Sequence, residues 1–129
     1  MVSCIEILIY RVQLVLKETY QTQIREDLFF AGQITGVEGY VESCASGMIA
    51  GINMARYLND KEPIIFGNTC VMGSQAYYVT HCDPKHFQPM NANFGIMHLN
   101  EKCRKHERKE KLCNQALERI KTIQGLLDE

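Results

Sequence analysis

The chain has 129 residues, of which 46% are apolar and 22% are charged, and its formal net charge is −1. This is the composition of one ordinary folded domain, and it excludes a disordered or low-complexity chain. The six cysteines stand at irregular spacings without a CxxC pair, so we expect reduced thiols in the cytoplasm and no disulfide framework. Glu6 and Arg11 interrupt the apolar opening stretch, which is too short to cross a bilayer, so we expect no membrane association.

The first half of the chain predicts a strand, a glycine loop and a helix. Residues 4–15 mix apolar and polar residues without a clear period, which permits a strand or a buried segment of no defined type. The apolar run at residues 28–32 predicts a short buried strand that ends at a glycine, of the kind usual in parallel sheets. Two further glycines follow in a loop, and residues 40–59 then carry apolar side chains at helical spacing.

Two glycines in the predicted helix indicate a close neighbour. Gly47 and Gly51 lie four residues apart and lower the helix propensity of the segment. Their small size lets another backbone approach closely. We therefore expect something to pack tightly against this helix.

The second half of the chain alternates short ordered elements with an irregular stretch. Pro63 ends the first helix, and residues 64–66 are expected to form a small strand. Residues 69–80 are expected to form a helix capped by Asn68 or Thr69, although their β-branched and aromatic content leaves a strand open. An irregular stretch broken by prolines runs to about residue 99.

The last predicted element is a long helix over residues 101–127. Its second half is amphipathic, whereas its first half carries a dense run of charge at residues 102–111. Such a run is usually a solvated helix face, stabilised by opposite charges at helical spacing. It is also the kind of segment that contacts phosphates.

The start of the helix at residue 40 is the candidate for chemistry. A helix amino terminus presents unpaired N–H groups and a partial positive charge, and glycines before it let a ligand come close. This favours a phosphate or cofactor site, while a simple tight turn explains the same glycines equally well. The pattern does not match the GxGxxG fingerprint.

Two longer strings carry a family resemblance. LFFAGQITGVEGYVES at residues 28–43, followed by ASG at 45–47 and AGIN at 50–53, closely resembles the last FAD-binding segment of the TrmFO family. The related GidA-type flavoproteins have a similar segment without the VEGYV wording. DPK at residues 83–85 with FQPMNANFG at 87–95 resembles a second TrmFO hallmark. The resemblance begins near Leu16 and covers the rest of the chain.

The resemblance implies an α/β fold. Residues 1–15 would be an unmatched segment, and residues 16–62 would be the closing part of a FAD-binding, Rossmann-like domain. Residues 63–129 would be a C-terminal region with the irregular stretch and the long terminal helix.

The activity implied is that of a folate-dependent tRNA methyltransferase. Members of the family bind FAD, reduce it with NAD(P)H, and take a one-carbon unit from methylenetetrahydrofolate. They deliver it as a methyl group to carbon 5 of a uridine in the tRNA T-loop. By position, Gly32 and Gln33 would lie beside the ribityl chain of the flavin. The backbone of Gly39, Tyr40 and Val41 would face the pyrimidine side of the flavin ring, where reduced flavin gathers negative charge.

The chain departs from the family pattern at two features that the activity requires. The chain has no GxGxxG turn for the FAD pyrophosphate, and none of its cysteines matches the family's nucleophile, so we expect no catalytic residue here. Without the amino-terminal half, the chain is not expected to catalyse methyl transfer by itself. A frameshift or a truncated gene would explain residues 1–15. An isolated strand at residues 28–32 would also expose its edges and favour aggregation.

Two other interpretations were weighed. A non-catalytic RNA-binding or interaction module that retains the basic C-terminal helix is the alternative to a methyltransferase segment. A zinc site at His81, Cys82 and His86 is disfavoured, because structural zinc needs four ligands at recognisable spacing, so we expect no metal.

Overall fold

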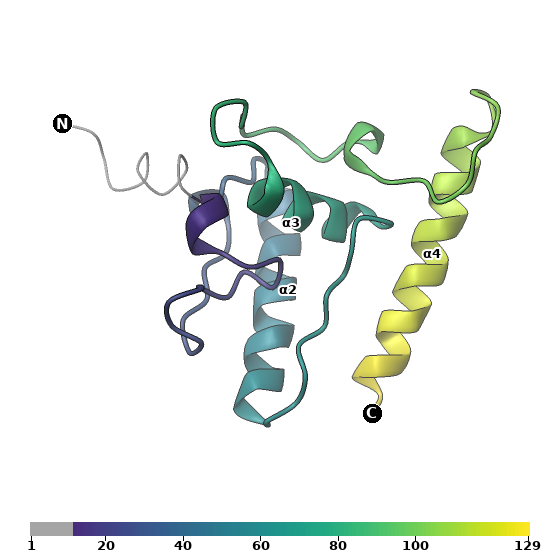
Figure 1. The fold of residues 1–129 in the computed structure, drawn as a ribbon. Coiled ribbons are helices and arrows are strands. Elements are labelled where there is room, and N and C mark those ends of the chain that lie inside the picture. The colour runs from purple at the N-terminus through teal and green to yellow at the C-terminus, as the bar shows by residue number, and fades with distance from the viewer. Residues whose placement is uncertain (1–11) are drawn as a thin grey trace.

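The computed structural model describes residues 12–129, which are mostly helical (Figure 1). In chain order, the elements are η1 (Gln33–Thr35), α2 (Tyr40–Leu58), α3 (Val71–His81), η2 (Phe94–Ile96) and α4 (Arg108–Leu127). Helix α2 packs against α3, and α3 packs against η2. The segment 59–70 runs between α2 and α4 (Figure 1).

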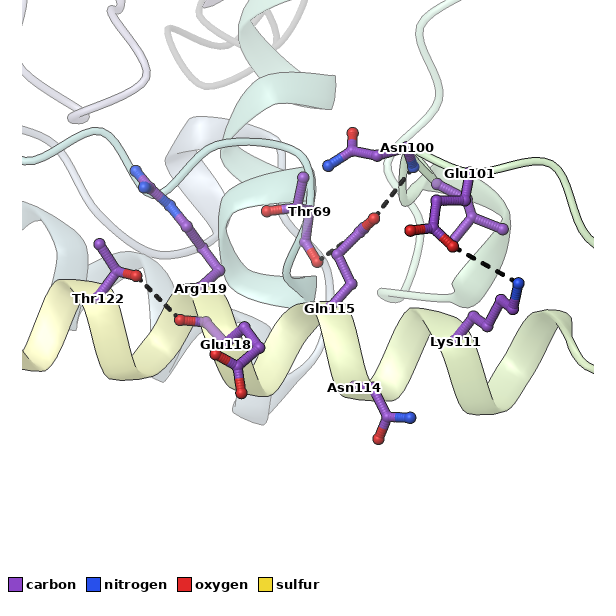
Figure 2. Close-up of a pocket in the computed structure, with 10 residues that line it drawn as sticks. Thr69, Asn100, Glu101, Lys111, Asn114, Gln115, Glu118, Arg119 and Thr122 are labelled. Atoms are coloured by element: carbon purple, nitrogen blue, oxygen red, sulfur yellow. Dashed lines mark hydrogen bonds and ion pairs between the residues drawn. The ribbon is translucent and has the colours of Figure 1, made fainter.

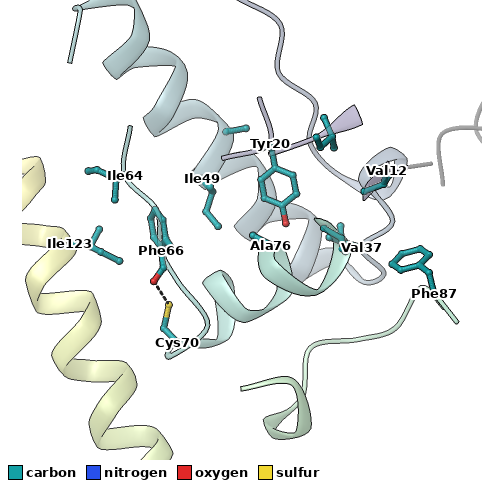
Figure 3. Close-up of a cluster of buried hydrophobic side chains, with 13 residues drawn as sticks. Val12, Tyr20, Val37, Ile49, Ile64, Phe66, Cys70, Ala76, Phe87 and Ile123 are labelled. Atoms are coloured by element: carbon teal, nitrogen blue, oxygen red, sulfur yellow. Dashed lines mark hydrogen bonds between the residues drawn. The ribbon is translucent and has the colours of Figure 1, made fainter. Parts of the chain in front are cut away.

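The core lies where α2, α3 and the extended segments meet (Figure 3). Ile49 of α2 and Ala76 of α3 are buried there, and Ile123 of α4 reaches it from the other side of Phe66. The largest side chain in it is Tyr20, whose burial raises the pKa of its hydroxyl well above the usual range. One small apolar cluster therefore joins α2, α3 and α4.

Helix α2 confirms the prediction for residues 40–59. Its buried residues stand at positions i, i+3, i+4 and i+7, which is the inner face of an amphipathic helix. They are Ser46, Ile49, Ala50 and Asn53. The helix ends at Asn59, and the turn that follows places Asp60 at a φ of 52° before Pro63.

The strand predicted at residues 28–32 is wrong. Among the described residues, this segment makes only an isolated antiparallel bridge between Gln21 and Phe29. Two backbone hydrogen bonds flank the bridge, from the N–H of Thr22 to the carbonyl of Leu28 (2.8 Å) and from the N–H of Phe30 to the carbonyl of Tyr20 (3.0 Å). A strand requires neighbours on its edges, and residues 12–129 supply one short partner only.

The strand predicted at residues 64–66 is also wrong, although the alternation that suggested it is real. Ile64 and Phe66 are buried while Ile65 between them is exposed. The segment has side-chain partners in place of a neighbouring strand. Asn53 accepts a hydrogen bond from the Ile64 N–H (2.7 Å) and donates one to the Ile64 carbonyl (3.1 Å).

The helix over residues 69–80 is confirmed as α3, but its cap is not the predicted one. The cap residue is Cys70, which makes no side-chain capping hydrogen bond. Gly73 of α3 lies so close to the backbone of Gly67 that a Cβ there would collide with the Gly67 carbonyl. The close neighbour predicted for Gly47 and Gly51 is absent among residues 12–129, because no atom lies within 4 Å of a Cβ built at either position.

Helix α4 is shorter than predicted, because residues 101–107 are not helical. This stretch is exposed and offers no apolar face to bury, whereas Leu112, the first buried residue of α4, is fully enclosed. The predicted segment 4–15 lies mostly outside the described residues, and its described part, residues 12–15, is helical.

The predicted α/β class therefore does not describe residues 12–129, which hold helices and isolated bridges. No helix in this part of the chain has both the length and the apolar character needed to cross a membrane.

Candidate functional site

An open hollow of about 720 Å³ lies at the amino-terminal end of α2. Its walls come from three separate stretches of the chain: η1, the start of α2 and the irregular segment before η2. The lining residues are Gly32, Gln33, Glu38, Gly39, Tyr40, Ser43 and Asn91.

Gly32 borders the hollow with bare backbone. Its φ of +81° strongly favours glycine, and a Cβ placed there would meet no atom within 4 Å. Its N–H donates to the Oγ of Ser46 (2.7 Å), a buried hydroxyl on α2, and its carbonyl accepts from the Oγ1 of Thr35 (2.7 Å). These contacts fix the loop against the helix and leave the outer side of Gly32 open.

The helix start forms the second wall. Gly39, at a φ of +109°, precedes the first helical residue and provides no side-chain cap. The first-turn N–H groups carry a partial positive charge, but the Glu42 carboxylate lies beside Gly39 and accepts a hydrogen bond from its own N–H. The Tyr40 side chain is 97% exposed and the Val41 side chain 79% exposed, so neither is part of the core.

Glu42 is an acid at the same helix end that the sequence analysis did not single out. Its carboxylate accepts hydrogen bonds from the Ala92 N–H (3.0 Å) and from the Asn91 amide (3.4 Å). The pKa of this carboxyl is lowered first by a hydrogen bond from its own backbone N–H and next by the one from Ala92. Glu42 stands three residues after the N-cap, where a capping box has its glutamate, but the N-cap is Gly39, so the sequence lacks the Ser or Thr that completes this signature.

The two strings of the resemblance meet at this site. Asn91, from the second string, donates to the carbonyl of Glu38 (3.1 Å), from the first. Of the five predicted cofactor-binding residues, Gly32, Gln33, Gly39 and Tyr40 line the hollow together. Val41 lies beside it on the helix and does not line it. Glu38, Ser43 and Asn91 were not predicted.

A second hollow of about 550 Å³ lies between α4 and the segment 98–101 (Figure 2). Gln115 spans it, donating to the His98 carbonyl (2.6 Å) and accepting from the Asn100 N–H (3.0 Å). Lys111 pairs with Glu101 across its end (3.5 Å). Because Gln115 and Lys111 bond to groups of the facing segment, this hollow marks the contact that holds the irregular segment against α4.

The remaining candidate side chains do not form a site together. His81 pairs with Glu18 (3.6 Å) and stacks on Tyr77, whereas His86 pairs with Asp83 (3.2 Å). Within residues 12–129, no three potential metal ligands gather. All five cysteines in that range are free, and burial raises the pKa of the Cys70 thiol, which keeps it protonated.

Comparison with known proteins decides the family. A family model described as "Glucose inhibited division protein A" matches residues 8–62, which includes every predicted cofactor-binding residue. The methylenetetrahydrofolate–tRNA-(uracil-5-)-methyltransferase TrmFO of Enterococcus faecalis is 58% identical over 114 residues, which is 86% of this chain. Over this length, the chain belongs to the TrmFO family.

Two further TrmFO proteins agree with this assignment. The Bacillus licheniformis protein is 55% identical over 114 residues, and the Lacticaseibacillus paracasei protein is 57% identical over 113 residues. In each case the chain spans about a quarter of the length of the TrmFO relative. The match to the family model begins at residue 8, whereas the TrmFO resemblance seen in the sequence begins near Leu16.

Proposed function

We propose that this chain supplies the flavin-facing segment of a folate-dependent tRNA uracil-5-methyltransferase, completing a FAD-binding, Rossmann-like domain whose other parts lie outside it. The name of its relatives describes a methylenetetrahydrofolate-dependent methyl transfer to carbon 5 of uracil in tRNA. The observation that carries the proposal is the hollow at the start of α2, where four of the five expected flavin contacts converge.

The residues of the hollow fit a flavin. Gly32 leaves room for close approach of the ribityl chain, because a Cβ built there would meet no atom within 4 Å, whereas the Glu42 carboxylate and the Asn91 amide fill the space beside Gly39. The N–H groups of Tyr40 and Val41 at the start of α2 provide donors for the electron-rich pyrimidine edge, while the N–H of Glu42 is taken by its own carboxylate. Tyr40, exposed beside this edge, offers an aromatic surface.

In this proposal, the bound flavin supplies the redox chemistry of one-carbon transfer, with NAD(P)H and methylenetetrahydrofolate as co-substrates. The residues of this chain orient the ring and stabilise negative charge at its edge. Asn91 and Glu42 keep the irregular segment closed against the helix start. The cytoplasm, where tRNA is modified, is the compartment we propose.

The test uses a full-length protein. The aligned segment of the Enterococcus faecalis TrmFO is replaced by this chain, and the purified chimera is assayed for flavin absorbance and for methyl transfer to tRNA. We expect the chimera to bind flavin and to transfer methyl groups to tRNA. We expect Gly32→Val to lower flavin occupancy at least tenfold, because the valine side chain blocks the flavin and strains the backbone. Gly125→Gln, on exposed α4, is the matched control and should change neither. Full flavin content in the Gly32→Val chimera would contradict the assignment.

A second function is favoured by the exposed cations before and at the start of α4. Lys102, Arg104, Lys105, Arg108 and Lys109 are exposed, and none takes part in an ion pair within the described residues. We propose that they contact RNA phosphates. Reversing the charges of Arg104, Lys105, Arg108 and Lys109 in the chimera should weaken tRNA binding and flatten its salt dependence. A colourless chain that still shifts tRNA in a gel would favour a pure RNA-binding module over a flavin segment.

A further inference from the structure

The side of α2 that faces away from the core carries a continuous stripe of exposed, uncharged residues. They recur at alternating spacings of three and four, as the contact positions of packed helices do. This outer stripe consists of Val41, Cys44, Met48, Gly51, Ala55 and Leu58.

The outer stripe is not covered by any other segment of residues 12–129. Met48 is 53% exposed and Leu58 is 71% exposed, although a solvent-facing helix side usually carries charge. A Cβ built at Gly51 or at the neighbouring Gly47 meets no atom within 4 Å. A second backbone therefore has room to approach, and a contiguous apolar surface of this kind marks an interface.

We propose that the outer stripe of α2 docks onto the part of the TrmFO polypeptide that lies outside this chain. Two observations select this occupant. The chain spans 26% of the Enterococcus faecalis relative, so about three quarters of the family sequence is available as a partner. The stripe also begins at Val41, beside the exposed Tyr40, so the open hollow and the stripe form one continuous surface.

The stripe also defines the chemistry of its partner. Because it holds no charged or hydrogen-bonding side chain except one thiol, the partner surface must be apolar. Because Gly47 and Gly51 leave the helix backbone uncovered, that surface can approach more closely than side chains would otherwise permit. The proposal rests on family membership, which the proposed function also uses, but it does not require that flavin binds.

Thiol labelling tests the inference directly. Cys44 lies in the outer stripe, and Cys113 is an exposed cysteine on α4. In the isolated chain, a small alkylating reagent should modify both, as read by peptide mass spectrometry. In the full-length chimera, Cys44 should react at least tenfold more slowly while Cys113 keeps its rate. Equal labelling of Cys44 in both proteins would overturn the proposal.

A pair of glycine variants provides a second readout. Gly51→Gln should raise the melting temperature of the isolated chain, because glutamine is a better helix former and meets nothing there. In the chimera the same change should lower the melting temperature, since it obstructs the docked surface. Gly125→Gln, at an equally open position of α4, should never lower it. A Gly51→Gln effect of the same sign in both proteins, or a chimera without this substitution that fails to fold, would count against docking.

Sedimentation of the isolated chain tests whether a second copy of this chain covers the stripe instead. We expect a monomer. A dimer in which Cys44 is protected would show that a second copy, and not the rest of TrmFO, covers the stripe. A chimera that protects Cys44 yet binds no flavin would support this inference while overturning the proposed function.

Discussion

Asn53 holds two parts of the chain together through a single buried amide. It donates to the carbonyls of Ile49 and Ile64 (both 3.1 Å) and accepts from the Ile64 N–H (2.7 Å). The side chain thereby takes the place of a strand neighbour for Ile64. Buried backbone groups require such partners, and this one comes from a helix.

Replacing this amide should destabilise the chain strongly. Asn53→Leu leaves the N–H and carbonyl of Ile64 without hydrogen-bond partners. The free energy of unfolding should fall by roughly 1–3 kcal/mol for each buried group left unpaired. The exposed Asn59, which donates to the Ala55 carbonyl (2.7 Å), is the control. Asn59→Leu should change the free energy of unfolding by less than about 0.5 kcal/mol. Urea denaturation compares the two, and equal effects would mean that the buried amide has no special role.

Glu42 makes the closure of the hollow sensitive to acid. Hydrogen bonds from its own N–H and from Ala92 favour the ionised form, so the pKa of its carboxyl is lowered in the fold. For an acid with a lowered pKa, the stabilisation is present above the unfolded value, about 4.3, and is lost as the pH falls through the folded value.

We therefore expect the Ala92 amide to lose hydrogen-exchange protection as the pH falls below the ordinary pKa of a glutamate, relative to its intrinsic exchange rate. In Glu42→Gln, protection of that amide should be weaker at neutral pH and should no longer vary over this range. Unchanged protection of Ala92 in acid would show that Glu42 does not hold the segment.

At the scale of elements, α3 depends on one close approach. Gly73 lies against the backbone of Phe66 and Gly67, where no other residue type fits without movement. Gly73→Ala should cost about 1–3 kcal/mol, because backbone rather than a flexible side chain must shift. Gly47→Ala, a helical glycine in open space, should instead stabilise by up to about 1 kcal/mol. Thermal unfolding of the two variants measures the difference, and a shared sign would contradict the packing.

Helix α4 is anchored largely through polar side chains. Arg119 donates to the carbonyls of Phe66 (2.9 Å) and Ile65, and Gln115 bridges His98 and Asn100. Only Leu112 and Ile123 of the helix are buried. The basic run before α4 is therefore free to face solvent while the helix stays docked.

Removing the Arg119 anchor should loosen α4. Arg119→Met is expected to cost about 1–2 kcal/mol, below the upper range for charged hydrogen bonds because the side chain is partly exposed. Lys121→Met removes only an exposed pair with Glu118 (3.2 Å) and should be nearly neutral. Faster amide exchange confined to residues 108–127 in Arg119→Met is the expected signature. Exchange indistinguishable between the two variants would argue against the anchor.

Local pattern predicted the helices well and the strands poorly. The apolar spacing of residues 40–59 needed only the one buried face that α3 provides, so α2 formed as predicted. Residues 28–32 and 64–66 have strand-like sequences, but a strand depends on partners that pattern does not supply. The charge run up to residue 107 stayed outside α4, since helix propensity alone is weak without an apolar face to bury.

At the scale of the whole molecule, residues 12–129 combine a small apolar core with two unfinished surfaces. One is the open hollow at the start of α2, and the other is the outer stripe along the same helix. Both lie on the element that the family resemblance marks most strongly. A chain that spans a quarter of its relatives' length is expected to leave such surfaces for the remainder to cover.

The amino-acid letters were enough to predict the family, the extents of α2 and α3 to within a few residues, and four of the residues that line the hollow. Those features depend on short-range spacing and on long matching strings. Three other features came from the folded chain: Asn91 and Glu42 meet across about fifty residues, Asn53 serves as the partner of Ile64, and the stripe on α2 is uncovered among residues 12–129. These facts depend on contacts between distant segments, and no local pattern of residues encodes which distant groups will satisfy a buried hydrogen bond or cover an apolar face.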